Sequence, residues 1–152
     1  MDAKFVQAVE SLHPKFEQLM ASPPHSPGAH LPQRGVYVFL EGGQALYVGR
    51  SNNIPRRFRD HRGKASGSNK AAFAMLIARR KLGLTADYHP GSGTRTNLSK
   101  QREFAEAFCD AKERIRAMEF HAVGEDDQMR QALLEIYCAV ALAAPYNDFG
   151  TH

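Results

Sequence analysis

Cysteine is scarce in this sequence, and its two copies do not support the sites that cysteine usually builds. Neither Cys109 nor Cys138 has metal-ligand spacing to another cysteine or to a histidine, so no cysteine-based metal site is expected. Both residues stand in helix-like segments of apolar character. We therefore expect two buried free thiols in a protein of a reducing compartment.

Long apolar runs and targeting signals are also missing. No apolar run reaches the roughly 20 residues that a membrane span needs. The first residues, MDAKFVQAVE, lack the basic-then-apolar pattern of a signal peptide. The glycines of residues 89–97 fit neither of the two common phosphate-binding motifs. We expect a soluble, cytoplasmic protein that has no membrane partner and no nucleotide-binding loop.

The length of the chain suits one compact domain. At 152 residues and 16.9 kDa it can bury a real hydrophobic core, but it is too short to predict two domains. The interval before residue 34 contains a helical pattern followed by a proline-rich stretch. We expect residues 1–33 to form an N-terminal helix and a connector that pack on a core made by residues 34–152.

The charge of the chain is moderately basic and unevenly placed. The formal net charge is +4, which permits a polyanionic partner without requiring one. Between residues 50 and 64, six basic residues face Asp60 alone, a local charge of +5. These basic residues are Arg50, Arg56, Arg57, Arg59, Arg62 and Lys64. For an ordinary helix, a solvated helix face would be the favoured explanation of such a cluster, but here the cluster lies beside Tyr37 and Tyr47.

Residues 34–63 carry the strongest local pattern. Two strand-like runs, Val36–Leu40 and Ala45–Val48, flank the turn sequence EGGQ, whose glycines permit the backbone angles of a tight hairpin. Asn52 or Asn53 can cap the helix that is predicted to follow at 54–62. The pattern predicts a β-hairpin that leads directly into a helix.

Four side chains of this stretch can converge. Arg57 and His61 are four residues apart and would lie on one face of the predicted helix. Tyr37 and Tyr47 stand on the two paired strands. Taken singly, a tyrosine on a half-buried strand is more often a packing residue than a functional one. Their arrangement with the Arg/His pair favours one small site.

An isolated carboxylate occurs near the end of the chain. From Ala132 to Ala144 every residue is apolar except Glu135, and the segment belongs to a helix predicted over residues 128–143. A buried carboxylate needs a partner or a metal ion, because its desolvation is costly. Helical geometry alone leaves two alternatives equally open: Glu135 is such a buried group, or it points to water.

At these residues the chain resembles the GIY-YIG nuclease family. The first signature tripeptide is Gly35-Val36-Tyr37, and the second is Tyr47-Val48-Gly49. The family's arginine and histidine match Arg57 and His61. Its metal-binding glutamate and closing asparagine match Glu135 and Asn147. The resemblance frames residues 35–147.

The resemblance implies an α/β (α+β) fold with a small three-stranded sheet, at least partly antiparallel and flanked by helices. We expect an additional N-terminal helix and a helical insertion between about residues 63 and 98. The remaining expected elements are helices over 3–20 with a kink or break at Pro14, 70–82 ending at Gly83, and 99–117, a strand over 119–123, an ambiguous segment over 84–88, and loops over 63–68 and 89–97.

The resemblance also implies roles for the matched residues. Tyr37 would be the general base, assisted by His61 or replaced by it. Arg57 would clamp phosphate, Glu135 would hold Mg²⁺ or Mn²⁺, and Tyr47 would orient phosphate or water. The implied function is divalent-metal-dependent endonuclease hydrolysis of phosphodiester bonds. Further expected roles are motif geometry for Gly35 and Gly49, a hydrogen-bonded chain end for Asn147, and nucleic-acid binding for Arg50, Arg56, Arg59, Arg62 and Lys64.

Two classes of function remain open at this point. The first is an active endonuclease on DNA, which is favoured over RNA as the substrate. The second is a nucleic-acid-binding or protein-interaction module with little catalytic turnover. The sequence contains no zinc finger, helix-turn-helix pair or repeat array that would deliver the site to a DNA sequence. Specificity would then come from DNA structure, from a homo-oligomer or from a protein partner.

Overall fold

A computed structural model describes residues 1–67, 69–83 and 95–149 of the chain. The chain divides into two compact units. The first unit contains Met1–Phe58 and Met118–Asp148. The second unit contains Arg59–Ala117 and the C-terminal end from Phe149. Within the described residues, no helix combines the length and the apolar character that crossing a membrane requires.

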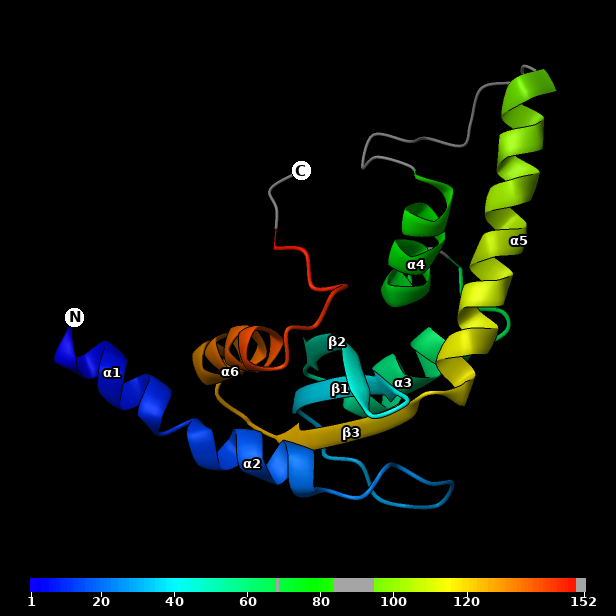
Figure 1. The fold of residues 1–152 in the computed structure, drawn as a ribbon. Helices are drawn as coiled ribbons and strands as arrows, with labels where there is room; N and C mark the ends of the chain where they lie inside the picture. The colour runs from blue at the N-terminus through cyan, green and yellow to red at the C-terminus, as the bar shows by residue number, and fades with distance from the viewer. Residues whose placement is uncertain (68, 84–94, 150–152) are drawn as a thin grey trace. The chain divides into compact units, whose positions relative to one another are not determined.

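The first unit is built on an open antiparallel sheet of three strands (Figure 1). Strand β1 (Gly35–Glu41) lies between β2 (Gln44–Ser51) and β3 (Glu119–Gly124). The predicted hairpin and the predicted third strand are confirmed, and all pairing is antiparallel. The α+β fold class expected from the sequence is therefore confirmed.

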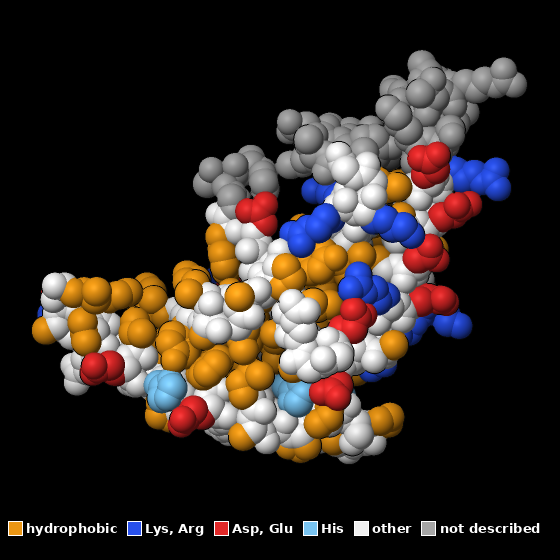
Figure 2. Space-filling view, in the orientation of Figure 1, with side chains coloured by type: hydrophobic (Ala, Val, Ile, Leu, Met, Phe, Trp, Pro, Cys, Tyr) orange, Lys and Arg blue, Asp and Glu red, His pale blue; other side chains and the backbone are white. Residues whose placement is uncertain are grey.

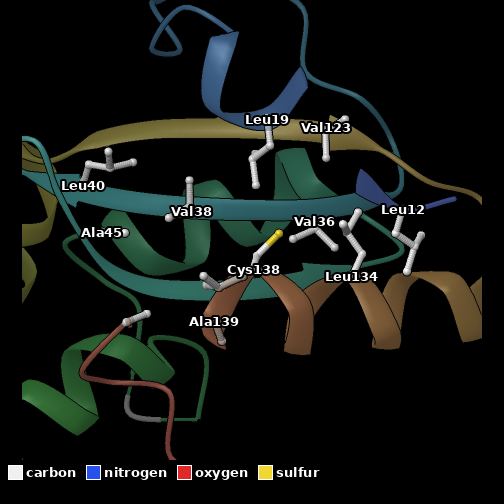
Figure 3. Close-up of a cluster of buried hydrophobic side chains, with 12 residues drawn as sticks. Leu12, Leu19, Val36, Val38, Leu40, Ala45, Val123, Leu134, Cys138 and Ala139 are labelled. Atoms are coloured by element: carbon white, nitrogen blue, oxygen red, sulfur yellow. The ribbon is translucent and has the colours of Figure 1, made fainter. Parts of the chain in front are cut away.

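The alternation of side chains along β1 creates two apolar faces. Val36 and Val38 join a buried cluster with Leu134 and Cys138 of α6 (Gln128–Ala141), as Figure 3 shows. The side chains between them point to the opposite face, because successive residues of a strand alternate. Burial on both faces explains why β1 reads as a continuous apolar run and occupies the central position.

The second apolar face is aromatic. Phe39 and Phe120 lie with ring centroids 5.0 Å apart, and Phe58 lies 4.8 Å from Phe120. His25, in the proline-rich connector, packs edge-on against Phe58 at 4.8 Å and donates its backbone N–H to the Phe120 carbonyl. Tyr37 stacks on Phe120 at 5.3 Å. This face therefore fixes one of the predicted site residues within a packed aromatic group.

The N-terminal segment forms two helices, α1 (Ala3–Glu10) and α2 (His13–Ala21). The predicted break near Pro14 is confirmed, because proline occupies the first turn of α2, where its missing N–H has no helical partner to lose. Asp2 caps α1 by accepting from the Phe5 N–H at 3.0 Å. Against α6, the Nδ1 of His13 lies 2.8 Å from the Tyr137 hydroxyl.

Polar caps set the helices that carry the predicted site residues. Helix α3 (Ile54–Arg62) has the predicted bounds, and Asn53 caps it by accepting from the Arg56 N–H at 3.1 Å. Asp127 caps α6 by accepting from the Arg130 N–H at 2.8 Å. Helix α6 ends at Ala141, two residues before its predicted end.

Apolar side chains also reach the outside of the first unit. On the face drawn in Figure 2 they gather over α1 and α6. Large exposed apolar residues of these two helices are Phe5, Met129, Ile136 and Val140. Helix α6 thus presents apolar side chains on its buried side and on its exposed side.

The second unit pairs α4 (Ala72–Leu82) with α5 (Arg95–Ala117). Gly83 caps α4 in the left-handed conformation, as predicted. Helix α5 begins at Arg95, so the loop predicted over 89–97 is wrong for residues 95–97, while residues 84–94, which include the ambiguous segment, lie outside the described residues. The insertion expected between residues 63 and 98 thus contains α4 and the start of α5.

Two further side chains of the second unit are informative. Lys112 is buried, and its ammonium group donates to the carbonyls of Lys64 and Ser66 at 2.6 and 3.0 Å, which holds the loop after α3. Cys109 is exposed, so the prediction of a buried thiol is wrong for it, whereas Cys138 in the first unit is buried as predicted. Helix α5 has an apolar side toward α4, and Cys109 lies outside it.

Candidate active site

Tyr37 has room for its side chain in the candidate site because its neighbour on the paired strand, Gly49, has no side chain. It is buried on β1 and stands directly opposite Gly49 on β2. A Cβ atom added at Gly49 would overlap the Tyr37 hydroxyl and the adjacent ring carbon. The glycine of the second signature tripeptide therefore makes room for the tyrosine of the first.

Gly35 has a different steric requirement. Its φ is +149°, and an added Cβ would overlap the backbone carbonyl of Val123 on β3. Because β1 approaches β3 this closely, only glycine fits the first position of the strand. The two signature glycines thus set the sheet geometry around Tyr37.

Four of the predicted site residues interact electrostatically. Burial raises the pKa of Tyr37 most, and the neighbouring Tyr47 and Glu135 raise it further, whereas the charge of Arg57 and its hydrogen bond to Tyr37 act in the opposite direction. Burial also raises the pKa of Tyr47, with Arg57 lowering it and Glu135 raising it. The structure therefore brings Tyr37, Tyr47, Arg57 and Glu135 into one cluster.

Glu135 is half-buried beside this cluster. Its side chain is 21% exposed, and its Oε2 accepts a hydrogen bond from the Nε of Arg50 at 3.0 Å. Burial raises the pKa of Glu135, and the charge and hydrogen bond of Arg50 oppose that shift. The structure lies between the two alternatives left open by the sequence: the Glu135 carboxylate is half-buried, and it has Arg50 as a partner.

Asn147 joins the C-terminal segment to the edge strand. Its carboxamide oxygen accepts from the Val48 N–H and its amide nitrogen donates to the Val48 carbonyl, both at 2.8 Å. The Tyr146 N–H adds a bond to the Leu46 carbonyl at 3.1 Å. These contacts fix β2 on both sides of Tyr47.

Gln131 is a polar residue of the site region that the sequence reasoning missed. It is 1% exposed, and its Nε2 donates to the Glu125 carbonyl at 2.7 Å and to the Asn52 side chain at 3.3 Å. It precedes Glu135 by one helical turn, so the spacing of the two residues was a usable signal. The contact with Asn52 ties α6 to the turn that leads into α3.

The remaining predicted residues have varied surroundings. In the first unit, Arg50 and Arg56 are exposed. In the second unit, His61 is buried one turn beyond Arg57 on α3, and Arg59 and Lys64 are exposed. Arg62 is half-buried, and it donates to the Arg116 carbonyl at 2.5 Å. Burial lowers the pKa of Arg62, and the charge of Arg116 adds to that effect.

The donor set of the cluster can be compared with what a metal ion requires. Within the part of the chain that the structure describes, no group of three or more His, Cys, Asp or Glu residues could hold a metal ion. Glu135 with nearby phenol oxygens is a sparse set of hard oxygen donors. Mg²⁺ is commonly held by one or two carboxylates, with waters and substrate phosphate oxygens in its other positions. The residues present fit such an ion.

Comparison with known families identifies a matching family. The sequence model of the GIY-YIG catalytic domain matches residues 33–133, which include Tyr37, Tyr47, Arg57 and His61 but end before Glu135. Comparison with curated proteins and with solved structures gives no match. The matched family implies a nuclease-type hydrolase with a nucleic acid as its substrate. Because the match covers most of the chain, this protein belongs to the GIY-YIG catalytic domain family.

Proposed function

We propose that this protein is a divalent-metal-dependent endonuclease that hydrolyses phosphodiester bonds in DNA. The observation that carries the proposal is the cluster of Tyr37, Tyr47, Arg57 and Glu135, contributed by β1, β2, α3 and α6. Phosphodiester hydrolysis needs a proton acceptor for the attacking water and positive charge near the phosphoryl oxygens. The cluster contains a candidate for each requirement.

Tyr37 is the proposed proton acceptor. Its raised pKa keeps the phenol neutral before substrate binds, and a neutral phenol is a weak base. Arg57 donates a hydrogen bond to it and carries a positive charge, and both stabilise the phenolate. Once the Tyr37 phenol has lost its own proton to solvent, the phenolate Oη would accept the proton of the attacking water. His61, one turn along α3, is the proposed assistant or the alternative acceptor.

Arg57 and Tyr47 are proposed to orient the phosphate. Arginine stays charged and presents several N–H donors in one plane, so Arg57 can hold a phosphate oxygen while it also contacts Tyr37. Tyr47 is half-buried two residues before Gly49, where its hydroxyl can donate to a phosphate oxygen or to the water. Asn147 would keep this part of β2 in place through Val48.

Glu135 is the proposed ligand for Mg²⁺ or Mn²⁺. When bound, such an ion supplies positive charge that polarises the phosphate and stabilises the leaving oxyanion. Gln131 would orient Glu135 by tying the preceding turn of α6 to Asn52. The proposed contacts to the DNA backbone are made by basic residues of α3 and its flanks, namely Arg50, Arg56, Arg59, Arg62 and Lys64.

The test is nicking of supercoiled plasmid in the presence of Mg²⁺ or Mn²⁺. Tyr37→Phe and Glu135→Gln should each lower the rate by about 100-fold or more, because each removes a group proposed to act in the reaction. Tyr137→Phe is the matched control for the first variant, since the Tyr137 hydroxyl contacts His13. Glu17→Gln is the control for the second, since Glu17 is 68% exposed and pairs with His13 on α2.

Circular dichroism and a thermal melt should first show that each variant is folded. Equal nicking by wild type and both site variants would contradict the assigned roles. A wild-type protein that binds duplex, branched or single-stranded DNA, or RNA, and cuts none of them would favour the binding-module alternative.

A further inference from the structure

The carboxylate proposed to hold the metal already has a cationic partner from a distant part of the chain. The Nε of Arg50, at the end of β2, lies 3.0 Å from the Oε2 of Glu135 on α6. The side chain of Glu135 is 21% exposed and that of Arg50 is 44% exposed. The carboxylate is therefore the inner member of the pair, and the guanidinium is the outer one.

The placement of Arg50 allows it to leave this partner. It follows Gly49 directly on β2, which is the edge strand of the sheet. Among the side chains that the structure describes, Glu135 is the one to which Arg50 donates a hydrogen bond. Arginine has a long flexible stem, and a guanidinium exposed to this extent can reach an incoming phosphate without desolvation of a buried charge.

The Arg50 guanidinium and a metal ion would compete for the Glu135 carboxylate, because both are cations. A dication held by the carboxylate would stand next to a guanidinium, and two cations at that distance repel strongly where water is partly excluded. A DNA phosphate, by contrast, is an anion that arginine binds through paired N–H donors. Binding of the metal ion to Glu135 would therefore favour movement of Arg50 to a DNA phosphate, and that movement would in turn favour metal binding.

We propose that Arg50 is a positioning residue that holds Glu135 in the absence of metal, competes with the metal for that carboxylate, and moves to a DNA phosphate when the metal binds. This inference rests on the proposed function, since it assigns Glu135 to the metal. It predicts opposite effects of one substitution: without Arg50, metal binds more tightly and DNA binds less tightly. A merely structural role for Arg50 would not change metal affinity in that direction.

The first experiment measures Mn²⁺ affinity without DNA, by electron paramagnetic resonance of free Mn²⁺. Arg50→Ala should bind Mn²⁺ about 5-fold or more tightly than wild type, because the competing cation is gone. Arg50→Lys keeps the charge and should stay within about 2-fold of wild type. Arg56→Ala removes the same charge from an exposed position on α3 and should also stay within about 2-fold. Glu135→Gln should lose the site.

The second experiment measures binding of a short DNA duplex by fluorescence anisotropy, in a Tyr37→Phe background that prevents cleavage. With Mn²⁺ present, Arg50→Ala should weaken binding by about 10-fold and reduce the salt slope by about 0.9, the effect of one lost phosphate contact. With EDTA in place of Mn²⁺, Arg50 stays on Glu135, and the same substitution should weaken binding by less than about 2-fold.

The outcomes separate this inference from the proposed function. The proposed competition would be overturned if Arg50→Ala binds Mn²⁺ no more tightly than Arg56→Ala. It would also be overturned if Glu135→Gln binds Mn²⁺ with the same affinity as wild type. If the wild-type protein nicks plasmid but Arg50→Ala does not change the Mn²⁺ affinity, the proposed function stands and the inference about Arg50 fails. If Arg50→Ala tightens Mn²⁺ binding but no variant nicks DNA, the competition stands and the assigned reaction fails.

Discussion

The carboxamide of Asn147 holds both backbone hydrogen-bonding groups of Val48, accepting from the N–H and donating to the carbonyl at 2.8 Å each. Val48 lies on the edge strand β2, where a backbone group without a strand partner depends on water or on a side chain. The two residues beside Val48 are Tyr47 and Gly49, so this clamp fixes the strand that bears the second signature tripeptide.

We predict that Asn147→Ala lowers the free energy of unfolding by about 1–2 kcal/mol, because two hydrogen bonds to partly buried backbone are lost. Urea denaturation would measure the change. Asn147→Asp should cost at least as much stability, because its second carboxylate oxygen would lie against the Val48 carbonyl oxygen, to which it cannot donate. Equal stability of wild type and Asn147→Ala would show that water replaces the clamp without loss.

Gly49→Ala should lower the nicking rate by about 100-fold, because a methyl group there displaces the Tyr37 hydroxyl. The variant should also lose about 1–3 kcal/mol of stability through overpacking, which a thermal melt would measure. Gly67→Ala is the matched control, since nothing lies within 4 Å of the Cβ that it adds. A fully active Gly49→Ala would mean that the Tyr37 hydroxyl need not occupy its present position.

Gln131→Met should reduce stability by about 1–3 kcal/mol, because the Glu125 carbonyl loses its buried donor. It should also weaken Mn²⁺ binding, since the turn that precedes Glu135 is no longer tied to Asn52. Gln128→Met, at the exposed start of α6, is the control. Loss of stability with unchanged Mn²⁺ affinity would reduce Gln131 to a packing role.

The rate of nicking should rise with pH if Tyr37 accepts the proton. A raised pKa means that the folded protein holds the phenolic proton more tightly, so the phenolate fraction is small at neutral pH. That fraction, and with it the rate, should increase by up to about tenfold per pH unit between about pH 6 and about pH 9. If the nicking rate instead levels off above a pH close to the usual histidine pKa of about 6.5, the proton acceptor would be assigned to His61.

Much of the sheet and of α3 could be predicted because their determinants are local. The turn at Glu41–Gln44 and the cap at Asn53 act within a few residues, and both are visible in the sequence. The four-residue spacing of Arg57 and His61 on α3 follows from the same local pattern. Steric pairs between strands, such as Tyr37 with Gly49, were implied only indirectly by the two tripeptides.

The contacts that could not be predicted join distant parts of the chain. Arg50 and Glu135 are 85 residues apart, and no local pattern relates them. Arg95–Asn97 have turn-like composition and still form helix, so local propensity did not decide their structure. Cys109 lies next to the buried stripe of α5 that includes Phe104, Phe108, Ala111 and Ile115. The helical spacing of that stripe therefore contained the signal that Cys109 is exposed, and the wrong prediction came from the average apolar character of the segment.

Tyr37 is almost completely buried within the sheet. The ring stacks on Phe120, meets Phe39 edge-on at 6.0 Å, and passes over the bare backbone of Gly49. Its hydroxyl consequently has few orientations to choose from, and the entropy of placing it is lost when the chain folds, before any substrate arrives. Substrate binding therefore has to order the DNA and the attacking water. It does not have to order Tyr37, the residue proposed to accept the proton of that water.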